Sequence, residues 1–170
     1  IASMGKHFPG HGNTAADSHH TLPVLKATLE EMETYELVPF QAAIDAGLDA
    51  MLVAHLSYPN VDPDYITSIS PTVITDLLRN AMGFEGVVFS DDMRMRGIRG
   101  KYSVGEAAVL HILAGGDVVL IGMHKSLQTE VLDSLYQALQ DGRLTRERLE
   151  ESVRRILRMK QKYNEGFAVS

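Results

Sequence analysis

Short apolar runs alternate with amphipathic segments along the chain. Residues 48–56 (LDAMLVAHL), 86–92 (GVVFSDD) and 116–124 (GDVVLIGMH) are compact hydrophobic runs that end in polar side chains. Such runs predict buried β-strands. Residues 1–7 (IASMGKH) have the form of the end of a further strand.

The segments between and after these runs have the spacing of helices. The predicted helices cover residues 29–47, 70–82, 104–114, 126–142 and 145–163. Ser70 and Thr145 stand where N-caps are expected, and Gly142 stands where a helix would stop. In the last helix the pattern aligns Leu149, Val153, Ile156 and Tyr163 on one face.

Strands that alternate with helices predict a parallel sheet or a β/α barrel. The polar residues fall at the carboxyl ends of the predicted strands, where α/β sheets and barrels carry their active sites. They are Lys6, His7, His55, Asp91, Asp92 and His124. Four strands make either a small open sheet or half of an eight-stranded barrel.

Composition narrows the classes of function. The chain has 170 residues, a formal charge of −6 and no cysteine. A domain of this charge is not expected to bind nucleic acid, and thiol catalysis and disulfides are excluded. No apolar run reaches the roughly 18 residues of a membrane-spanning helix.

The stretch GKHFPGHGNTAADSHH, residues 5–20, holds four of the seven histidines. His7 and His11 are four residues apart, as zinc ligands on a helix are, but Pro9, Gly10 and Gly12 prevent a helix there. We therefore expect neither a metal nor another cofactor. Asp17 and His19 are two residues apart, and a carboxylate beside an imidazole suits a proton donor. The alternative is that they are ordinary loop residues.

Other candidates also have plain alternatives. Asp91 could be a carboxylate held at the mouth of a pocket, or Asp91 and Asp92 could both cap a helix or solvate a loop. His55 is a candidate for substrate binding or a hydrogen-bonded core histidine. Met123 is a candidate for substrate binding or a packing residue.

Three segments together resemble one known family. KHFPGHGNTAADSHHTLP, AHLSYPNVDP and LLRNAMGFEGVVFSDDMRMRGI, with AGGDVVLIG and RLEESVRRILRMK after them, are similar to glycoside hydrolase family 3. Because the first segment contains an Asp-x-His string, the sequence is most similar to the bacterial β-N-acetylglucosaminidase branch of this family. The resemblance extends over essentially the whole chain.

The resemblance implies a (β/α)8 barrel and a retaining mechanism without a cofactor. It places the nucleophile on Asp91, the acid/base on His19 paired with Asp17, and contacts to sugar hydroxyls on Lys6 and His7. The expected substrate is a glycan or muropeptide that carries terminal N-acetylglucosamine, as in bacterial cell-wall turnover. The alternatives are a phosphorylase, in which phosphate replaces water, and a glycan-binding fragment that cannot turn over.

The family's barrel also has a first half, which this chain does not contain. We therefore expect residues 1–170 to be the C-terminal half of a barrel domain that needs its N-terminal half for a full pocket. A cytoplasmic location is expected, with an exported form as the alternative.

Overall fold

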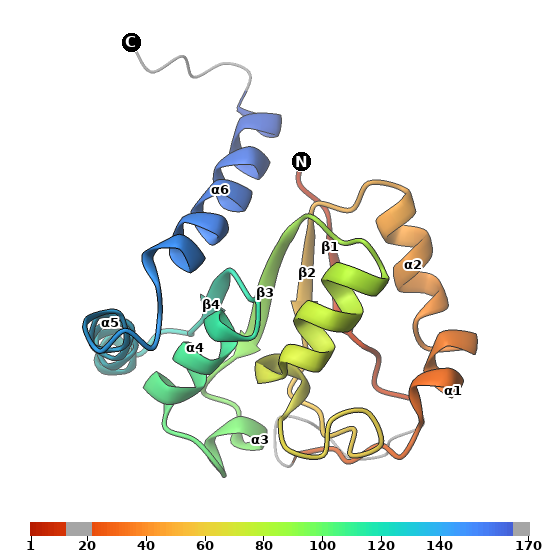
Figure 1. The fold of residues 1–170 in the computed structure, drawn as a ribbon, viewed down its shortest axis with the longest axis horizontal. Coiled ribbons are helices and arrows are strands. Elements are labelled where there is room, and N and C mark those ends of the chain that lie inside the picture. The colour runs from red at the N-terminus through yellow and green to blue at the C-terminus, as the bar shows by residue number, and fades with distance from the viewer. Residues whose placement is uncertain (13–21, 165–170) are drawn as a thin grey trace.

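The computed structural model describes residues 1–12 and 22–164. Its centre is a four-stranded parallel sheet in the order β1-β2-β3-β4 (Figure 1). The strands are β1 (Met4–Phe8), β2 (Ala50–Val53), β3 (Val87–Asp92) and β4 (Val118–Leu120). All four predicted strands are therefore confirmed, and only β1 extends beyond its predicted range, by the one residue Phe8.

The described helices connect and follow the strands. They are α1 (Leu29–Thr34), α2 (Val38–Asp45), η1 (Thr67–Ile69), η2 (Thr72–Ala81), α3 (Arg96–Arg99), α4 (Val104–Leu113), α5 (Lys125–Gln140) and α6 (Arg146–Tyr163). This strand–helix alternation, with every strand pair parallel, confirms the α/β barrel-type fold class.

The helix predicted over residues 29–47 is wrong in one respect, because the structure divides it into α1 and α2. Pro39 lies in the first turn of α2. In one continuous helix its ring would clash with the carbonyl of Tyr35, whereas the first turn of a new helix tolerates it. The break therefore lies where proline requires it.

The predicted helix ends are largely confirmed. Ser70 Oγ accepts a hydrogen bond from Val73 N at 3.0 Å, and Thr145 caps α6 through Arg148 N. Gly142 follows α5 with φ +74°, a conformation that favours glycine. The predicted apolar face of α6 is only partly covered, since Val153 is 51% exposed.

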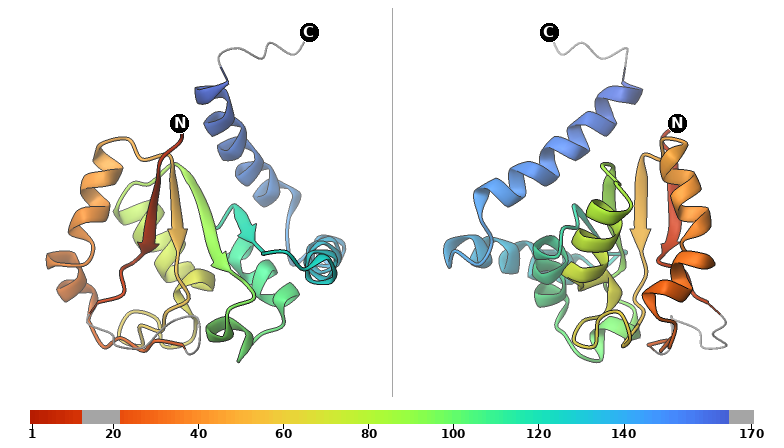
Figure 2. Two further views of the ribbon diagram at one scale, coloured as in Figure 1. Left: turned by 180° about the vertical axis from the view of Figure 1, so that it is seen from behind. Right: turned by 45° about the vertical axis from the view of Figure 1, so that its right-hand side comes forward.

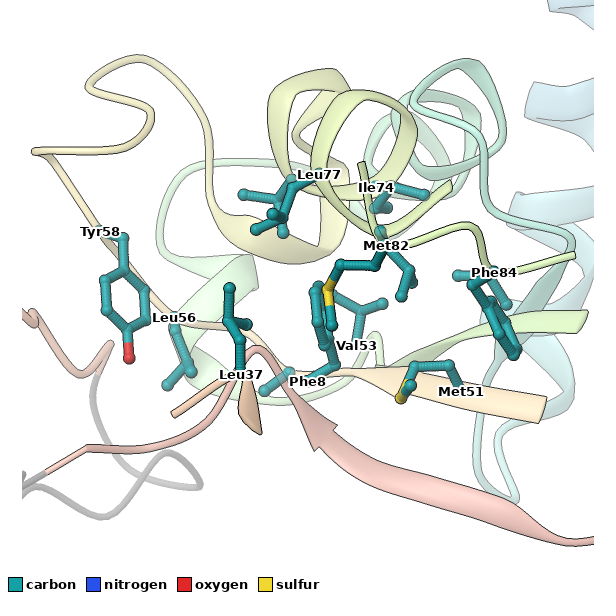
Figure 3. Packing of buried hydrophobic residues seen from close by; sticks show 14 of the residues in the cluster. Phe8, Leu37, Met51, Val53, Leu56, Tyr58, Ile74, Leu77, Met82 and Phe84 are labelled. Carbon is teal, nitrogen blue, oxygen red and sulfur yellow. The ribbon is translucent and has the colours of Figure 1, made fainter. Parts of the chain in front are cut away.

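The main core lies between the sheet and the helices. Met51 and Val53 of β2 lie in one apolar cluster with Ile74 and Leu77 of η2 (Figure 3). Val88 of β3 belongs to the same cluster. In Figure 1, η2 and α4 lie in front of the strands, and the strands come forward when the molecule is seen from behind (Figure 2). The helices η2 and α4 therefore cover one face of the sheet.

The two edge strands expose side chains on the described part of the molecule. Met4 of β1 is 42% exposed and Leu120 of β4 is 41% exposed, and Lys6 is also exposed. In contrast, Ala50 and Val87 in the central strands are buried. The named side chains are thus buried on the central strands and partly exposed on the two edge strands.

A buried charge cluster ties α6 to the sheet. Asp117, directly before β4, has a fully buried side chain that accepts a hydrogen bond from Val88 N at 2.9 Å. Arg79 binds its carboxylate at 2.7 Å, and Arg155 of α6 at 3.1 Å. Ser152 of α6 donates to it at 2.7 Å. These contacts hold α6 at the end of the sheet opposite the carboxyl ends of the strands.

Candidate active site

The sheet brings the predicted site residues to one edge. Because all four strands are parallel, their carboxyl ends point the same way, and the arrowheads share one end of the sheet in Figure 2. Lys6 and His7 lie in β1, His55 follows β2, Asp91 is near the end of β3, and Met123 follows β4. This edge is where parallel α/β sheets bind ligands.

The end of β1 is shaped by a tight turn. Gly10 N donates to His7 O at 2.8 Å, and Tyr58 Oη donates to Gly10 O at 2.8 Å. Gly10 has φ +111°, so a side chain there would be strained. Burial, with the charge of Glu36, raises the pKa of Tyr58 to about 12, so its hydroxyl stays a donor.

The two histidines of this segment meet edge to face. The rings of His7 and His11 have centroids 5.3 Å apart at 87°. The Lys6–His7 and Phe8–Pro9 peptide bonds are cis. Lys6 is exposed and His7 half-buried, so both lie where a ligand at the strand ends could reach them.

Asp91 and Asp92 have different surroundings although they are adjacent. Asp92 binds Arg94 in a bidentate pair, with Nη2 to Oδ2 at 2.6 Å and Nε to Oδ1 at 3.1 Å. Burial acts to raise the pKa of Asp92, but the hydrogen bonds and charge of Arg94 outweigh it and lower the pKa. A carboxylate held in this way is a poor nucleophile, because both oxygens are already occupied.

Asp91 is half-buried and accepts a hydrogen bond from Asp92 N at 2.8 Å. Across residues 1–12 and 22–164 we find no cationic side chain bonded to it. One oxygen is therefore oriented by the backbone, and no cation of the described residues pairs with the carboxylate. This arrangement is compatible with an attacking carboxylate, a role of Asp91 that stays a prediction.

His55 lies behind the strand ends. Its ring is fully buried, with Nδ1 2.6 Å from Ser68 Oγ and Nε2 3.2 Å from Asp92 O. This matches the alternative of a hydrogen-bonded core histidine, since no part of the ring is at the surface. Burial lowers the pKa of His55, and the nearby carboxylates of Asp91 and Asp92 act against that shift.

The remaining candidates differ in how far the structure describes them. Met123 is 97% exposed in the turn after β4, so it is not the packing residue that the alternative envisaged, and substrate binding stays a prediction. Asp17 and His19 lie outside the described residues, and their acid/base role also stays a prediction.

Sequence reasoning missed the residues that support Asp91. Arg94 stands two positions after Asp92, a spacing that could have indicated a local ion pair. Ser68, which lies 2.6 Å from His55 Nδ1, has no such signal, because only the fold brings it there. In the described part of the chain, no cluster of three or more histidine, aspartate or glutamate side chains could hold a metal ion.

Comparison with known proteins agrees with this architecture. Residues 1–159 match the model of the glycosyl hydrolase family 3 N-terminal domain. The chain belongs to glycosyl hydrolase family 3. A β-hexosaminidase of Xylella fastidiosa (strain 9a5c) is 46% identical over 130 residues, which are 76% of this chain and 38% of that protein.

Solved structures of family 3 proteins superpose closely on the chain. A family 3 β-N-acetylglucosaminidase from Paenibacillus sp. matches with a TM-score of 0.93 and 41% identity, over 100% of this chain and 33% of that one. A β-glucoside phosphorylase bound to 2FGlc matches with a TM-score of 0.86 and 30% identity, over 95% of this chain and 30% of that one.

The family 3 chain described here spans about 38% of the length of the curated relative. The fold and the strand-end arrangement are therefore those of a part of the longer relatives. Among the helices of residues 1–12 and 22–164, none combines the length and apolar character of a membrane span.

Proposed function

We propose that this chain is part of a retaining β-N-acetylhexosaminidase that removes terminal N-acetylglucosamine from cell-wall-derived glycans. The observation that carries the proposal is the contrast at the end of β3. Asp92 is paired with Arg94, whereas Asp91 accepts a hydrogen bond from a backbone N–H and binds no cationic side chain of residues 1–12 and 22–164. The name of the Xylella relative, β-hexosaminidase, supports the choice of sugar.

In this proposal Asp91 attacks the anomeric carbon and forms a covalent glycosyl-enzyme, and the glycosidic oxygen leaves with a proton from His19. His19, oriented by Asp17, then takes a proton from the water that releases the sugar. Lys6 and His7 hydrogen bond to sugar hydroxyls, and Met123 contacts the substrate from the turn after β4. The side chains of this mechanism need no metal.

We also propose that the chain supplies four βα units of a barrel of eight. Met4 and Leu120, 42% and 41% exposed on the two edge strands, are apolar side chains that neighbouring strands would cover. The 38% share of the Xylella relative that the chain covers supports the same view. The pocket would then be completed by residues outside this chain.

Trapping of the intermediate tests the nucleophile. A slowly reacting fluorinated N-acetylglucosaminide, incubated with the full-length protein and followed by peptide mapping, should add its mass to Asp91. Asp91→Asn should abolish labelling. Asp92→Asn is the matched control and should still be labelled at Asp91, although more slowly because Arg94 loses its partner. A label on Asp92 would refute the assignment.

Phosphorolysis is a second candidate, favoured by the TM-score of 0.86 to a β-glucoside phosphorylase. An imidazole acid/base repels an incoming phosphate less than a carboxylate would. Product analysis with and without phosphate separates the two reactions. If a sugar 1-phosphate formed in place of free sugar, the reaction would be phosphorolysis and not hydrolysis. The proposed role of Asp91 would be the same in both reactions.

A further inference from the structure

His55 joins the end of β3 to the interior of the protein. Its Nε2 lies 3.2 Å from Asp92 O and its Nδ1 lies 2.6 Å from Ser68 Oγ. Ser68 O in turn lies 2.7 Å from Nδ1 of His111. His55 thus links the partly buried Asp92 to the buried Ser68, and the carbonyl of Ser68, rather than its hydroxyl, contacts the buried His111.

The chemistry of the partners determines where the hydrogens lie. A carbonyl oxygen only accepts, so His55 Nε2 carries a hydrogen and donates it to Asp92 O. In a neutral ring Nδ1 is then an acceptor, and Ser68 Oγ donates to it. By the same reasoning His111 Nδ1 donates to Ser68 O. Burial, which lowers the pKa of both histidines, favours these neutral forms.

The chain of hydrogen bonds ends on the residue that orients Asp91. The carbonyl of residue 92 accepts from His55 Nε2 and also from Met95 N at 2.9 Å, and its carboxylate binds Arg94. Its N–H donates to Asp91 Oδ1 at 2.8 Å. A shift of this backbone would therefore displace the donor that orients the Asp91 carboxylate.

We propose that His55 is a positioning residue, which acts through the backbone of Asp92 to aim the Asp91 carboxylate at the anomeric carbon. This inference rests on the proposed function and assigns His55 a role other than contact with substrate. A fully buried ring cannot touch the sugar, but it can fix the strand end on which the attacking group stands.

His55→Phe tests the role in the full-length protein, since it keeps an aromatic ring of similar size and removes both nitrogens. Misplacement of a reacting group by about 1 Å costs about 10²-fold in rate. We expect a loss of kcat/KM of about this size, carried by kcat with little change in KM. The loss should be equal for nitrophenyl and alkyl N-acetylglucosaminides, because every leaving group needs the same nucleophile. His55→Gln, whose amide can donate to Asp92 O, should recover most of the rate.

His111→Asn is the matched control. His111 is equally buried but contacts Ser68 rather than Asp92, so its variant should lose stability while its rate stays within about threefold of the parent. Thermal melting reports folding independently of turnover. If His55→Phe does not fold, Ser68→Ala removes the donor to Nδ1 and should give the same pattern with a smaller loss.

Three results would overturn the positioning role: a folded His55→Phe with the parent rate, a loss confined to poor leaving groups, or an equal loss in His111→Asn. If Ser68→Ala is used in its place, a rate equal to that of the parent protein would also overturn the positioning role. A parent protein without activity on any N-acetylglucosaminide would instead refute the proposed function.

Discussion

The buried His111 should make the protein lose stability in mild acid. Burial lowers its pKa from 6.5 to about 4, although the Ser68 carbonyl and the charge of Asp117 act in the opposite direction. Above pH 6.5 the imidazole is neutral in both the folded and unfolded states and has no effect on the pH dependence. As the pH falls below this value, the unfolded state binds the proton first and is favoured.

The size of the effect follows from the shift. Once most of the unfolded state carries the proton, stability falls by up to about 1.4 kcal/mol per pH unit, so His111 should account for about 2 kcal/mol of lost stability between pH 7 and pH 4.5. This is a substantial part of the 5–15 kcal/mol that is typical of a domain. The loss levels off below pH 4, where the folded state also binds the proton. Asp49, whose pKa is lowered by its hydrogen bonds with Lys162 and Ser3, loses its contribution only in stronger acid.

His111→Asn isolates this contribution, because its amide can donate to Ser68 O but does not titrate in this range. Urea unfolding, followed by circular dichroism at pH 7 and pH 4.5, gives the loss of free energy for the parent and for the variant. We expect the variant to be less stable at pH 7 but to lose about 2 kcal/mol less than the parent on acidification. His55, whose pKa burial also lowers, remains in both proteins. Equal losses in the two proteins would refute the reasoning.

Three further results are expected. Asp117→Ala should destabilise the protein by about 3–5 kcal/mol, because it leaves buried arginines without a counter-charge. Loss of the exposed Glu106–Arg143 pair in Glu106→Ala should cost at most about 1 kcal/mol, and similar urea midpoints for the two variants would contradict this. His19→Ala should slow alkyl glycosides by about 10²- to 10⁴-fold and nitrophenyl glycosides far less, and equal slowing would remove its acid role. Dialysis against a strong chelator should leave the hydrolysis rate unchanged, and activity restored by zinc would reverse that expectation.

Much of the fold could be predicted because it depends on local patterns. The apolar runs predicted all four strands, and the caps Ser70 and Thr145 predicted where two helices begin. Alternation of strand and helix predicted the parallel order, which in turn brought Lys6, His7 and Asp91 to one edge. The division of the first predicted helix at Pro39 also had a local cause, which the periodicity alone did not reveal.

The sequence by itself determined which residue types stand at the strand ends, since strand periodicity and spacing are local properties. The structure showed how Asp91 differs from Asp92, although the nearby Arg94 could have indicated this pair from its spacing. Only the tertiary structure brought His55 and His111 onto Ser68 and placed Arg79 and Arg155 around Asp117. These contacts join residues 13 to 43 positions apart, and a buried polar group is satisfied by whatever partner the packing brings near, which no local pattern specifies.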